Sequence, residues 1–365
     1  MNVTCTVEKL KNAVALADRM TGKQLTLPVL HAIYISATGS RVVVRSTNLA
    51  VGVEIEIPAQ VTQEGVVVVK GDVVANVCNN LPASTEVTLT LENDNLTITT
   101  QKTTTVIKSL PPEEFPALPT VEGDTVELQT STLIEGIRSV YFAAALTEIK
   151  PEIASIYIYS DSNTLYFVAT DSFRLAEKKF TIKGLSEISK ILIPYKNIAD
   201  LLKVLDVCGS TVHLSYSRTQ LSIRSNALYF TSRLIDGGFP PYHLIIPKEE
   251  TTKVTVMKQD LIHILRLSTV FADKFLQVVI HVQPTTKHIS ISSKNTDIGS
   301  SISDIDAVIE GDDIEVVCNL KYFLDVFQAL PGDSLSISFT APNKPIVIKS
   351  VSDSSFLYLL MPTNR

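Results

Sequence analysis

The sequence contains no tryptophan, and its four cysteines lie far apart with no C-x-x-C pair among them. The missing tryptophan argues against a carbohydrate- or ligand-binding β-rich protein, because flat aromatic rings, tryptophan above all, supply the contact platforms of that class. Cys5, Cys78, Cys208 and Cys318 lack the spacing of a disulfide framework or a zinc site. Reduced, mostly buried thiols of an intracellular protein are therefore expected.

Long apolar runs and targeting segments are also lacking. No run approaches the roughly 18 apolar residues that span a bilayer. The N-terminus, MNVTCTVEKLKNAV, has no apolar core of the kind that a signal peptide needs and is expected to be a strand leading into a helix. These two absences predict a soluble, cytoplasmic protein.

Signatures of catalysis are missing as well. There is no G-x-S-x-G, P-loop or dinucleotide fingerprint, and the six histidines are scattered without metal-ligand spacing. The acidic pairs Glu113–Glu114 and Asp312–Asp313 fall in connectors and turns, where a solvated surface role is the ordinary one. No catalytic residue, no metal and no cofactor are predicted, and an enzyme that uses a cleft between repeats remains only an alternative.

What the sequence does have is a threefold repeat of one pattern: an apolar strand, a helix, then a two-stranded hairpin. It is clearest in ILIPYKNIADLLKVLDVCGSTVHLSYSRTQLSI, residues 191–223, where Ile198, Leu201, Leu202 and Leu205 form one helical face. The pattern also occurs at residues 66–98 and 315–348. Successive copies are about 125 residues apart, close to the usual size of a domain. The predicted domains are therefore residues 1–122, 123–249 and 250–365.

Each repeat is predicted to contain two helices and about eight strands, an α+β unit with mainly antiparallel sheets. The first helix of each repeat is expected at about residues 8–20, 132–145 and 257–271. In the third of these, Leu261, Ile264, Leu265 and Val270 are expected to face inward. The proline-rich segment LPPEEFPALPT, residues 110–120, is expected to connect the first two repeats.

The formal charge of −6 gives no general attraction for nucleic acid, so DNA binding would need a local basic surface. The predicted helices carry scattered cations, namely Lys9, Lys11, Arg19, Arg138, Lys196, Lys203, Lys258, Arg266 and Lys321. Acidic residues on the same helices make ordinary salt-bridged faces the simpler interpretation. If the repeats closed into a ring, these faces could instead line a channel that attracts duplex phosphates without reading sequence.

Apolar residues on the connectors allow two interpretations, a sealed domain junction or a peptide-binding groove. Leu175 and the run Leu244–Ile246 flank proline-broken segments, and the last strand ends in Leu359, Leu360 and Met361. Such residues usually seal a junction between domains. The alternative is a groove that accepts a peptide of a partner protein.

Four motifs, in order along the chain, resemble those of the bacterial DNA polymerase III β subunit family, the β sliding clamps. They are TLPVL at residues 26–30, VATDSFRLA at 168–176, SRLIDGGFPPYHLIIP at 232–247 and the terminal LMPTNR. The resemblance covers the whole length. It implies the DNA-clamp fold, with three such domains per chain and a head-to-tail dimer that closes a six-domain ring.

The resemblance also implies a function: a non-catalytic processivity factor that encircles double-stranded DNA nonspecifically. Its implied partners are the catalytic subunit of DNA polymerase III, a clamp loader, other proteins with a clamp-binding motif, and a second copy of the chain, with no membrane. Partners would insert a short peptide with glutamine and leucine or phenylalanine anchors. The residues that match the family's groove are Ile153, Thr170, Ser172, Phe173, Arg174, Leu175, Pro240, Leu244, Ile245, Leu359, Met361 and Pro362.

Within that groove, the apolar members would bury the anchors, while Thr170, Arg174 and backbone groups would orient the peptide. Two positions depart from the family pattern: Phe173 stands where histidine is frequent, and Thr363–Asn364 replaces a more apolar ending. Both departures bear on which peptide is preferred.

Two further sets of residues follow from the resemblance. The positions that would face DNA are Lys23, Gln24, Lys150, Lys196, Lys203 and Arg266. The positions that would form the dimer interface are Thr105, Ile107, Val270, Phe271 and Phe275. Phe271 and Phe275 are also spaced to pack together in their own core, which is the alternative to an interface.

Overall fold

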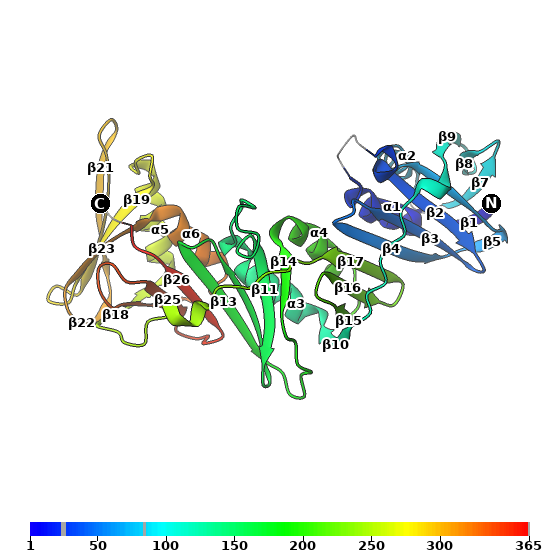
Figure 1. The fold of residues 1–365 in the computed structure, drawn as a ribbon. Helices are drawn as coiled ribbons and strands as arrows, with labels where there is room; N and C mark the ends of the chain where they lie inside the picture. The colour runs from blue at the N-terminus through cyan, green and yellow to red at the C-terminus, as the bar shows by residue number, and fades with distance from the viewer. Residues whose placement is uncertain (23–26, 83–84, 364–365) are drawn as a thin grey trace. The chain divides into compact units, whose positions relative to one another are not determined.

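The computed structural model describes residues 1–22, 27–82 and 85–363 and shows the predicted alternation of helices and antiparallel strands (Figure 1). The repeated pattern is confirmed in all three places. At residues 191–223 it comprises β14 (Ile191–Pro194), α4 (Tyr195–Leu205), β15 (Thr211–Tyr216) and β16 (Gln220–Ser225). In α4 the buried apolar residues are Ile198, Leu201, Val204 and Leu205, while Leu202 is only half-buried.

The first repeat begins with β1 and α1, whose apolar face includes Val7, Leu10 and Val14. Its elements are β1 (Asn2–Thr6), α1 (Val7–Arg19), η1 (Pro28–His31), β2 (Ala32–Thr38), β3 (Arg41–Thr47), β4 (Val51–Pro58), β5 (Gln60–Gln63), β6 (Gly65–Lys70), α2 (Gly71–Asn79), β7 (Glu86–Glu92), β8 (Asn95–Thr99), β9 (Thr104–Leu110) and η2 (Pro112–Glu114).

The second repeat differs from expectation in its first helix, which is followed by a short 3-10 turn instead of continuing to residue 145. Its elements are β10 (Asp124–Gln129), α3 (Thr130–Val140), η3 (Tyr141–Ala143), β11 (Ser155–Asp161), β12 (Thr164–Thr170), β13 (Arg174–Thr181), then β14, α4, β15 and β16 as above, β17 (Leu228–Arg233) and η4 (Tyr242–Ile245).

The third repeat comprises β18 (Thr252–Met257), α5 (Lys258–Val270), β19 (Gln277–Gln283), β20 (His288–Asn295), β21 (Gly299–Asp306), β22 (Val308–Gly311), β23 (Ile314–Asn319), α6 (Leu320–Asp325), η5 (Val326–Gln328), β24 (Ser334–Phe339), β25 (Ile346–Ser350) and β26 (Phe356–Leu360). The prediction that Val270 faces inward is wrong, because its side chain is 58% exposed. Leu261 and Leu265 are buried as expected. At 3.6 residues per turn, Val270 lies on the opposite side of α5 from Leu261.

The chain divides into two compact units, and both contain part of the second repeat. Residues 1–134 and 196–234 form the first unit, and residues 135–195 and 235–365 form the second. The first unit has one 13-stranded sheet, in the order β10-β15-β16-β17-β4-β3-β2-β6-β9-β8-β7-β1-β5. The second has a nine-stranded sheet, β14-β11-β12-β13-β26-β25-β24-β18-β22, and a four-stranded one, β21-β20-β19-β23.

Two strand pairs join neighbouring repeats within these sheets, and we call them the β4–β17 seam and the β13–β26 seam (Figure 1). In the first, residues 51–55 pair antiparallel with residues 228–232. In the second, residues 174–178 pair antiparallel with residues 356–360. Sheets that continue across repeats explain why the compact units do not follow the repeats of the sequence.

Candidate functional site

The tight turn between β12 and β13 is fixed by its own hydrogen bonds. Asp171 Oδ1 accepts the backbone N–H of Phe173 at 2.9 Å and that of Arg174 at 3.0 Å. The Thr170 hydroxyl donates to the Arg174 carbonyl at 2.6 Å and accepts the Ser172 N–H at 3.1 Å. Ser172 has a φ of 79°, the left-handed conformation that non-glycine residues adopt at some cost. The turn therefore holds Phe173 outward, with 58% of that residue exposed.

Arg174 forms a buried ionic link between the second and third repeats. Its Nε donates to Asp171 Oδ2 at 2.9 Å, and its Nη1 donates to Asp325 Oδ2, at the end of α6, at 2.6 Å. The guanidinium lies 4.4 Å from the centre of the Tyr322 ring. Burial by itself would lower the pKa of Arg174, but its hydrogen bonds to Asp325 and Asp171 and the charge of Asp171 help to raise that pKa above the ordinary value. The group stays charged and holds β13 against α6.

An apolar surface forms where the turn meets the end of β26. The Met361 N–H donates to the Phe173 carbonyl at 2.8 Å, so the two residues are neighbours. The Phe173 and Tyr322 rings lie 6.5 Å apart between centres and 25° from parallel. Met361 and Pro362 are half-buried beside them. Phe173, Tyr322 and Met361 therefore present a continuous apolar face to solvent.

The short helix η4 brings two more exposed apolar side chains to the same sheet. Its Tyr242 is buried and donates a hydrogen bond to the Glu177 carboxylate, while its hydroxyl also bonds that of Tyr159 at 2.7 Å. Burial and the neighbouring Glu177 carboxylate raise the pKa of Tyr242, so the phenol stays protonated. Pinned in this way, η4 leaves Leu244 82% and Ile245 47% exposed.

The structure brings most of the predicted peptide-binding residues together in the second unit. Leu175 of β13, Leu359 of β26 and Tyr242 of η4 belong to one buried cluster with Val168 and Val347. The exposed members of the predicted set are Ser172 and Phe173 in the turn and, around η4, Pro240, Leu244 and Ile245. Ile153 is buried, at 8% exposure. The arrangement is a buried apolar floor with exposed apolar side chains above it.

Two predicted site residues have hydrogen-bond partners within the chain itself. Thr170 and Arg174 were predicted to orient a peptide, but each already satisfies partners within its own chain, and only 8% of the Arg174 side chain is exposed. Sequence reasoning missed their supporting residues, Asp171, Tyr322 and Asp325. Asp171 stands inside the motif VATDSFRLA, and an aspartate that opens a tight turn is a recognisable signal. No sequence signal connected Asp325 with Arg174, because these residues meet only in the folded chain.

The cations predicted to face DNA lie on the surface where the structure describes them. Lys150, Lys196, Lys203 and Arg266 are all exposed. Lys203 also pairs with Asp206 at 3.5 Å. Lys23 and Gln24 lie outside the described residues. Exposure leaves the described cations accessible to phosphate groups.

The predicted interface residues lie beside two strand edges. β9 pairs with β8 along residues 104–108, whereas β6 reaches only residues 109 and 110, so in the described chain residues 104–108 have a free strand edge. β21 likewise has only β20 beside it. Thr105 is half-buried and Ile107 is buried, while the residue between them, Val106, is 62% exposed. Strand alternation therefore turns Val106 outward, a position that the sequence prediction did not include.

In the third repeat, Val270 and Phe275 are 58% and 62% exposed, and Phe271 is half-buried. A purely internal packing role, the alternative considered for the two phenylalanines, does not account for an exposed Phe275. Val270 ends α5 and Phe275 lies shortly after it, in the repeat that also contains the free edge of β21.

The cysteines are free thiols, three of them buried, as predicted. Burial raises the pKa of Cys5 and of Cys318 to about 12, so both stay protonated and unreactive. Over residues 1–22, 27–82 and 85–363, no three His, Cys, Asp or Glu side chains converge as a metal site would require. None of the helices in those segments has both the length and the apolar character of a membrane span.

Comparison with known protein families assigns the whole length of the chain. Residues 1–119 match the N-terminal domain of the DNA polymerase III β subunit, residues 127–241 its central domain, and residues 243–364 its C-terminal domain. The β sliding clamp of Synechocystis is 27% identical over 388 residues, covering 99% of both proteins. That of Staphylococcus epidermidis is 26% identical over 347 residues, covering 92% of both.

Solved structures agree with this assignment. The DNA polymerase III β subunit of Thermotoga maritima is 28% identical, with a TM-score of 0.93 over 100% of this chain and 99% of that one. The sliding clamp of Bacillus subtilis is 25% identical, with a TM-score of 0.94 over the same shares. A three-domain antiparallel α+β chain with this topology is a clamp-type protein of DNA replication.

The chain belongs to the DNA polymerase III β subunit family. Its function is that of a DNA sliding clamp, a processivity subunit without catalysis of its own, with DNA and a DNA polymerase as its partners. Family membership thereby confirms the fold class and the function that the motifs implied.

Proposed function

We propose that this clamp tethers its partners through a short linear peptide bound on the apolar surface of the second unit. The observation that supports this most directly is the exposure of Phe173, Leu244 and Ile245 above the buried cluster of Leu175 and Leu359. Exposed apolar side chains gathered over a rigid support are the usual character of a peptide-binding surface. Peptide anchors of leucine or phenylalanine would pack against them, with Met361, Pro362, Pro240 and the buried Ile153 completing the groove.

Thr170, Ser172 and Arg174 contribute to this groove as its support. Their hydrogen bonds fix the turn that projects Phe173, so the surface is formed before the peptide arrives. Preformed surfaces lose less conformational freedom on binding, which favours affinity. A glutamine anchor would then be oriented by backbone groups.

The double substitution Met361→Ala with Pro362→Ala tests this assignment. It should abolish binding of a fluorescent peptide with glutamine, leucine and phenylalanine anchors, as measured by anisotropy, while the solution mass stays unchanged. Lys11→Met, on α1 in the first unit, is the matched control and should bind the peptide normally. Unchanged affinity in the double variant would count against the groove.

We further propose that two copies of the chain associate head to tail, with residues 1–122, 123–249 and 250–365 as the domains of a six-domain ring. The free edge of β9 and the free edge of β21 support this, because an exposed edge is a template for pairing with another strand. Val106, Val270 and Phe275 would supply apolar contact, with Thr105, Ile107 and Phe271 behind them. The interface therefore includes Val106 in addition to the residues predicted from the sequence.

Solution mass across a dilution series tests the dimer. A species of twice 39.9 kDa that persists on dilution supports the ring. Val106→Lys should shift the equilibrium toward the monomer, because it places a charge in an apolar contact. A strict monomer in the unmodified chain would reject the ring.

Within such a ring, Lys150, Lys196, Lys203 and Arg266 would face the duplex and contact phosphates without reading bases. Retention would then depend on topology, which suits a chain whose net charge is −6. The clamp should remain on closed circular DNA and leave it after linearisation. A clamp loader would open the ring, and the site of action would be the cytoplasm.

A further inference from the structure

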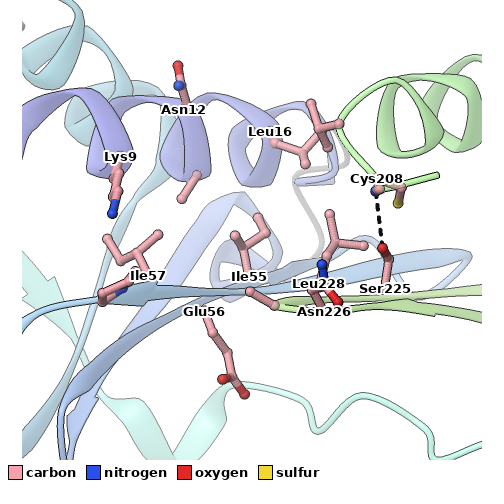
Figure 2. Close-up of a pocket in the computed structure, with 15 residues that line it drawn as sticks. Lys9, Asn12, Leu16, Ile55, Glu56, Ile57, Cys208, Ser225, Asn226 and Leu228 are labelled. Atoms are coloured by element: carbon pink, nitrogen blue, oxygen red, sulfur yellow. Dashed lines mark hydrogen bonds between the residues drawn. The ribbon is translucent and has the colours of Figure 1, made fainter. Parts of the chain in front are cut away.

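A cavity of about 340 Å³ lies beside the β4–β17 seam, under α1 in the first unit (Figure 2). Its floor is formed by side chains that rise from the sheet toward α1, namely Ile55, Ile57 and Leu228. Ala13 and Leu16 of α1 form the roof, and the segment Val207–Gly209 after α4 closes one end. Cavities that bind small molecules measure roughly 300–1,000 Å³ and are mostly apolar, and this one fits the lower part of that range.

The cavity exists because small or short side chains of α1 face the seam. Ala13 and the half-buried Leu16 do not fill the space above Ile55. At the other wall, Val207 is 62% exposed, although it is a large apolar residue at the mouth of an apolar cavity. The end wall is held in place by the Gly209 N–H, which donates to Ser225 Oγ at 3.2 Å (Figure 2).

One charged side chain points into this space. Lys9 extends from α1 toward the sheet at the Ile57 end, whereas Glu56 points to the opposite face of the sheet (Figure 2). Glu56 is engaged there by Arg41 at 2.7 Å. Within the described segments, Lys9 has no hydrogen bond or ion pair. The cavity therefore has a cationic end and an otherwise neutral, apolar body.

Its dimensions favour an elongated occupant. Lys9 and Leu16, at the two ends of the roof, are seven residues apart on α1, about 10 Å along the helix axis. Burial raises the pKa of Cys208, so that thiol stays neutral near the far end and adds no charge. An apolar chain could lie on Ile55 and Leu228 with one anionic group at Lys9.

We propose that this cavity binds an amphipathic organic anion, an acyl-chain carboxylate whose carboxylate pairs with Lys9 and whose chain packs against Ile55, Ile57 and Leu228. The site belongs to both repeats of the seam, because α1 and β4 come from the first and β17 and the Val207–Gly209 segment from the second. It is independent of the peptide-binding surface, whose residues lie in the second unit.

Titration calorimetry with octanoate tests the proposal on the full-length clamp. Octanoate should bind saturably, and octan-1-ol, which has the same chain without the charge, should bind more weakly. Lys9→Met should lower the affinity for octanoate at least fivefold and leave that for octan-1-ol unchanged. Lys11→Met, on the same helix but outside the cavity, should change neither affinity.

Ala227→Trp provides a second variant, which fills the cavity from its mouth. Ala227 is an exposed lining residue, so the fold tolerates a larger side chain there. This variant should lose binding of both ligands while its thermal unfolding stays that of the unmodified clamp. Retained binding in Ala227→Trp would overturn the proposal.

Three other results would overturn it: absence of saturable octanoate binding, equal octanoate affinity in Lys9→Met, or loss of octanoate binding in the Met361→Ala, Pro362→Ala double variant. The last of these would place octanoate on the apolar surface of the second unit. Peptide binding by the double variant is a separate measurement, so failure of this site and failure of the peptide groove are distinguishable.

Discussion

The β13–β26 seam and the β4–β17 seam have the same backbone pairing and opposite side-chain chemistry. Each joins neighbouring repeats through five antiparallel residue pairs. At the β13–β26 seam, two cations of β13 are buried and bind acids of the third repeat. Arg174 pairs with Asp325 at 2.6 Å, and Lys178 pairs with Asp353 at 3.3 Å, both with side chains only 8% exposed.

Among the residues that the structure describes, the β4–β17 seam has no such buried cation. The ion pairs Arg45–Glu54 and Arg41–Glu56 stay within the first repeat and are partly exposed. Across the two repeats, the described residues include the ion pair Arg19–Asp200, in which 43% of the arginine side chain is exposed. Backbone bonds, such as the Glu56 N–H to the Ala227 carbonyl at 2.7 Å, and apolar contacts provide the rest.

The difference has physical consequences. A buried charge must keep its partner, because an unpaired charge in the protein interior is costly. The β13–β26 seam is thus specified by a few residues and supports the proposed peptide-binding surface beside it. Apolar contacts are non-directional, and the β4–β17 seam leaves a cavity with mostly apolar walls.

The largest predicted effect comes from Arg174→Met. Removing the guanidinium leaves Asp171 and Asp325 without their cation, and the expected loss in the free energy of unfolding is about 3 kcal/mol. Arg45→Met at the other seam removes a partly exposed pair and should cost about 1 kcal/mol or less. Urea unfolding followed by circular dichroism measures both. Equal losses would mean that the two seams do not differ as described.

Truncation of one leucine at each seam should give a smaller difference between the seams in the loss of unfolding free energy. Leu359, 1% exposed, packs in the cluster under the peptide surface, and Leu359→Ala should cost about 3 kcal/mol and weaken peptide binding. Leu228 is 9% exposed and borders an existing cavity, so Leu228→Ala should cost about 2 kcal/mol. Peptide binding should be normal in Leu228→Ala. Impaired peptide binding in that variant would contradict the separation of the two sites.

The smallest predicted effect is the loss of the stability that Asp353 contributes as the pH becomes acidic. Burial tends to raise the pKa of Asp353, but hydrogen bonds from Ser355 and the charge of Lys178 outweigh it and hold the pKa below 3.8. A carboxylate whose pKa is lowered in the folded state stabilises the fold above pH 3.8. This stabilisation is lost as the pH falls through the folded-state pKa. Because Asp353 is a quarter exposed, Asp353→Asn should cost less than about 1 kcal/mol at pH 6.

The pH dependence distinguishes this mechanism from simple loss of a contact. The difference in urea midpoint between Asp353→Asn and the unmodified chain should shrink between pH 6 and pH 3. A difference that is constant with pH would show that the charge of Asp353 contributes nothing. Asp206→Asn, which removes the partner of Lys203 in a surface pair at the end of α4, serves as the control and should change little at either pH.

Much of the fold could be predicted because it depends on local patterns. The alternation in Val212, Leu214 and Tyr216 fixed β15, and the apolar spacing of Leu10 and Val14 fixed α1. Val270 shows where this reasoning failed. It is apolar and close in sequence to a buried face, but helical rotation turns it to solvent, and nothing in its residue type reveals that.

For the proposed peptide-binding surface, the sequence motifs indicated candidate positions but not how those residues are held in place. Motifs identified Phe173 and Arg174, but only the folded chain shows that Arg174 is sequestered by Asp171 and Asp325. The structure was also needed to decide whether Ile107 or Val106 faces outward at the strand edge, because a shift of one residue exchanges the two faces of a strand.

By itself, the sequence determined the number of repeats, the type and approximate bounds of their elements, and the family, because each of these is recorded in local periodicity or in short motifs. The tertiary structure alone decided which strands join the repeats, which cations are buried, and where a cavity remains. Those features depend on residues more than a hundred positions apart, such as Arg174 and Asp325 or Ile55 and Leu228, whose contacts form only when the chain has folded.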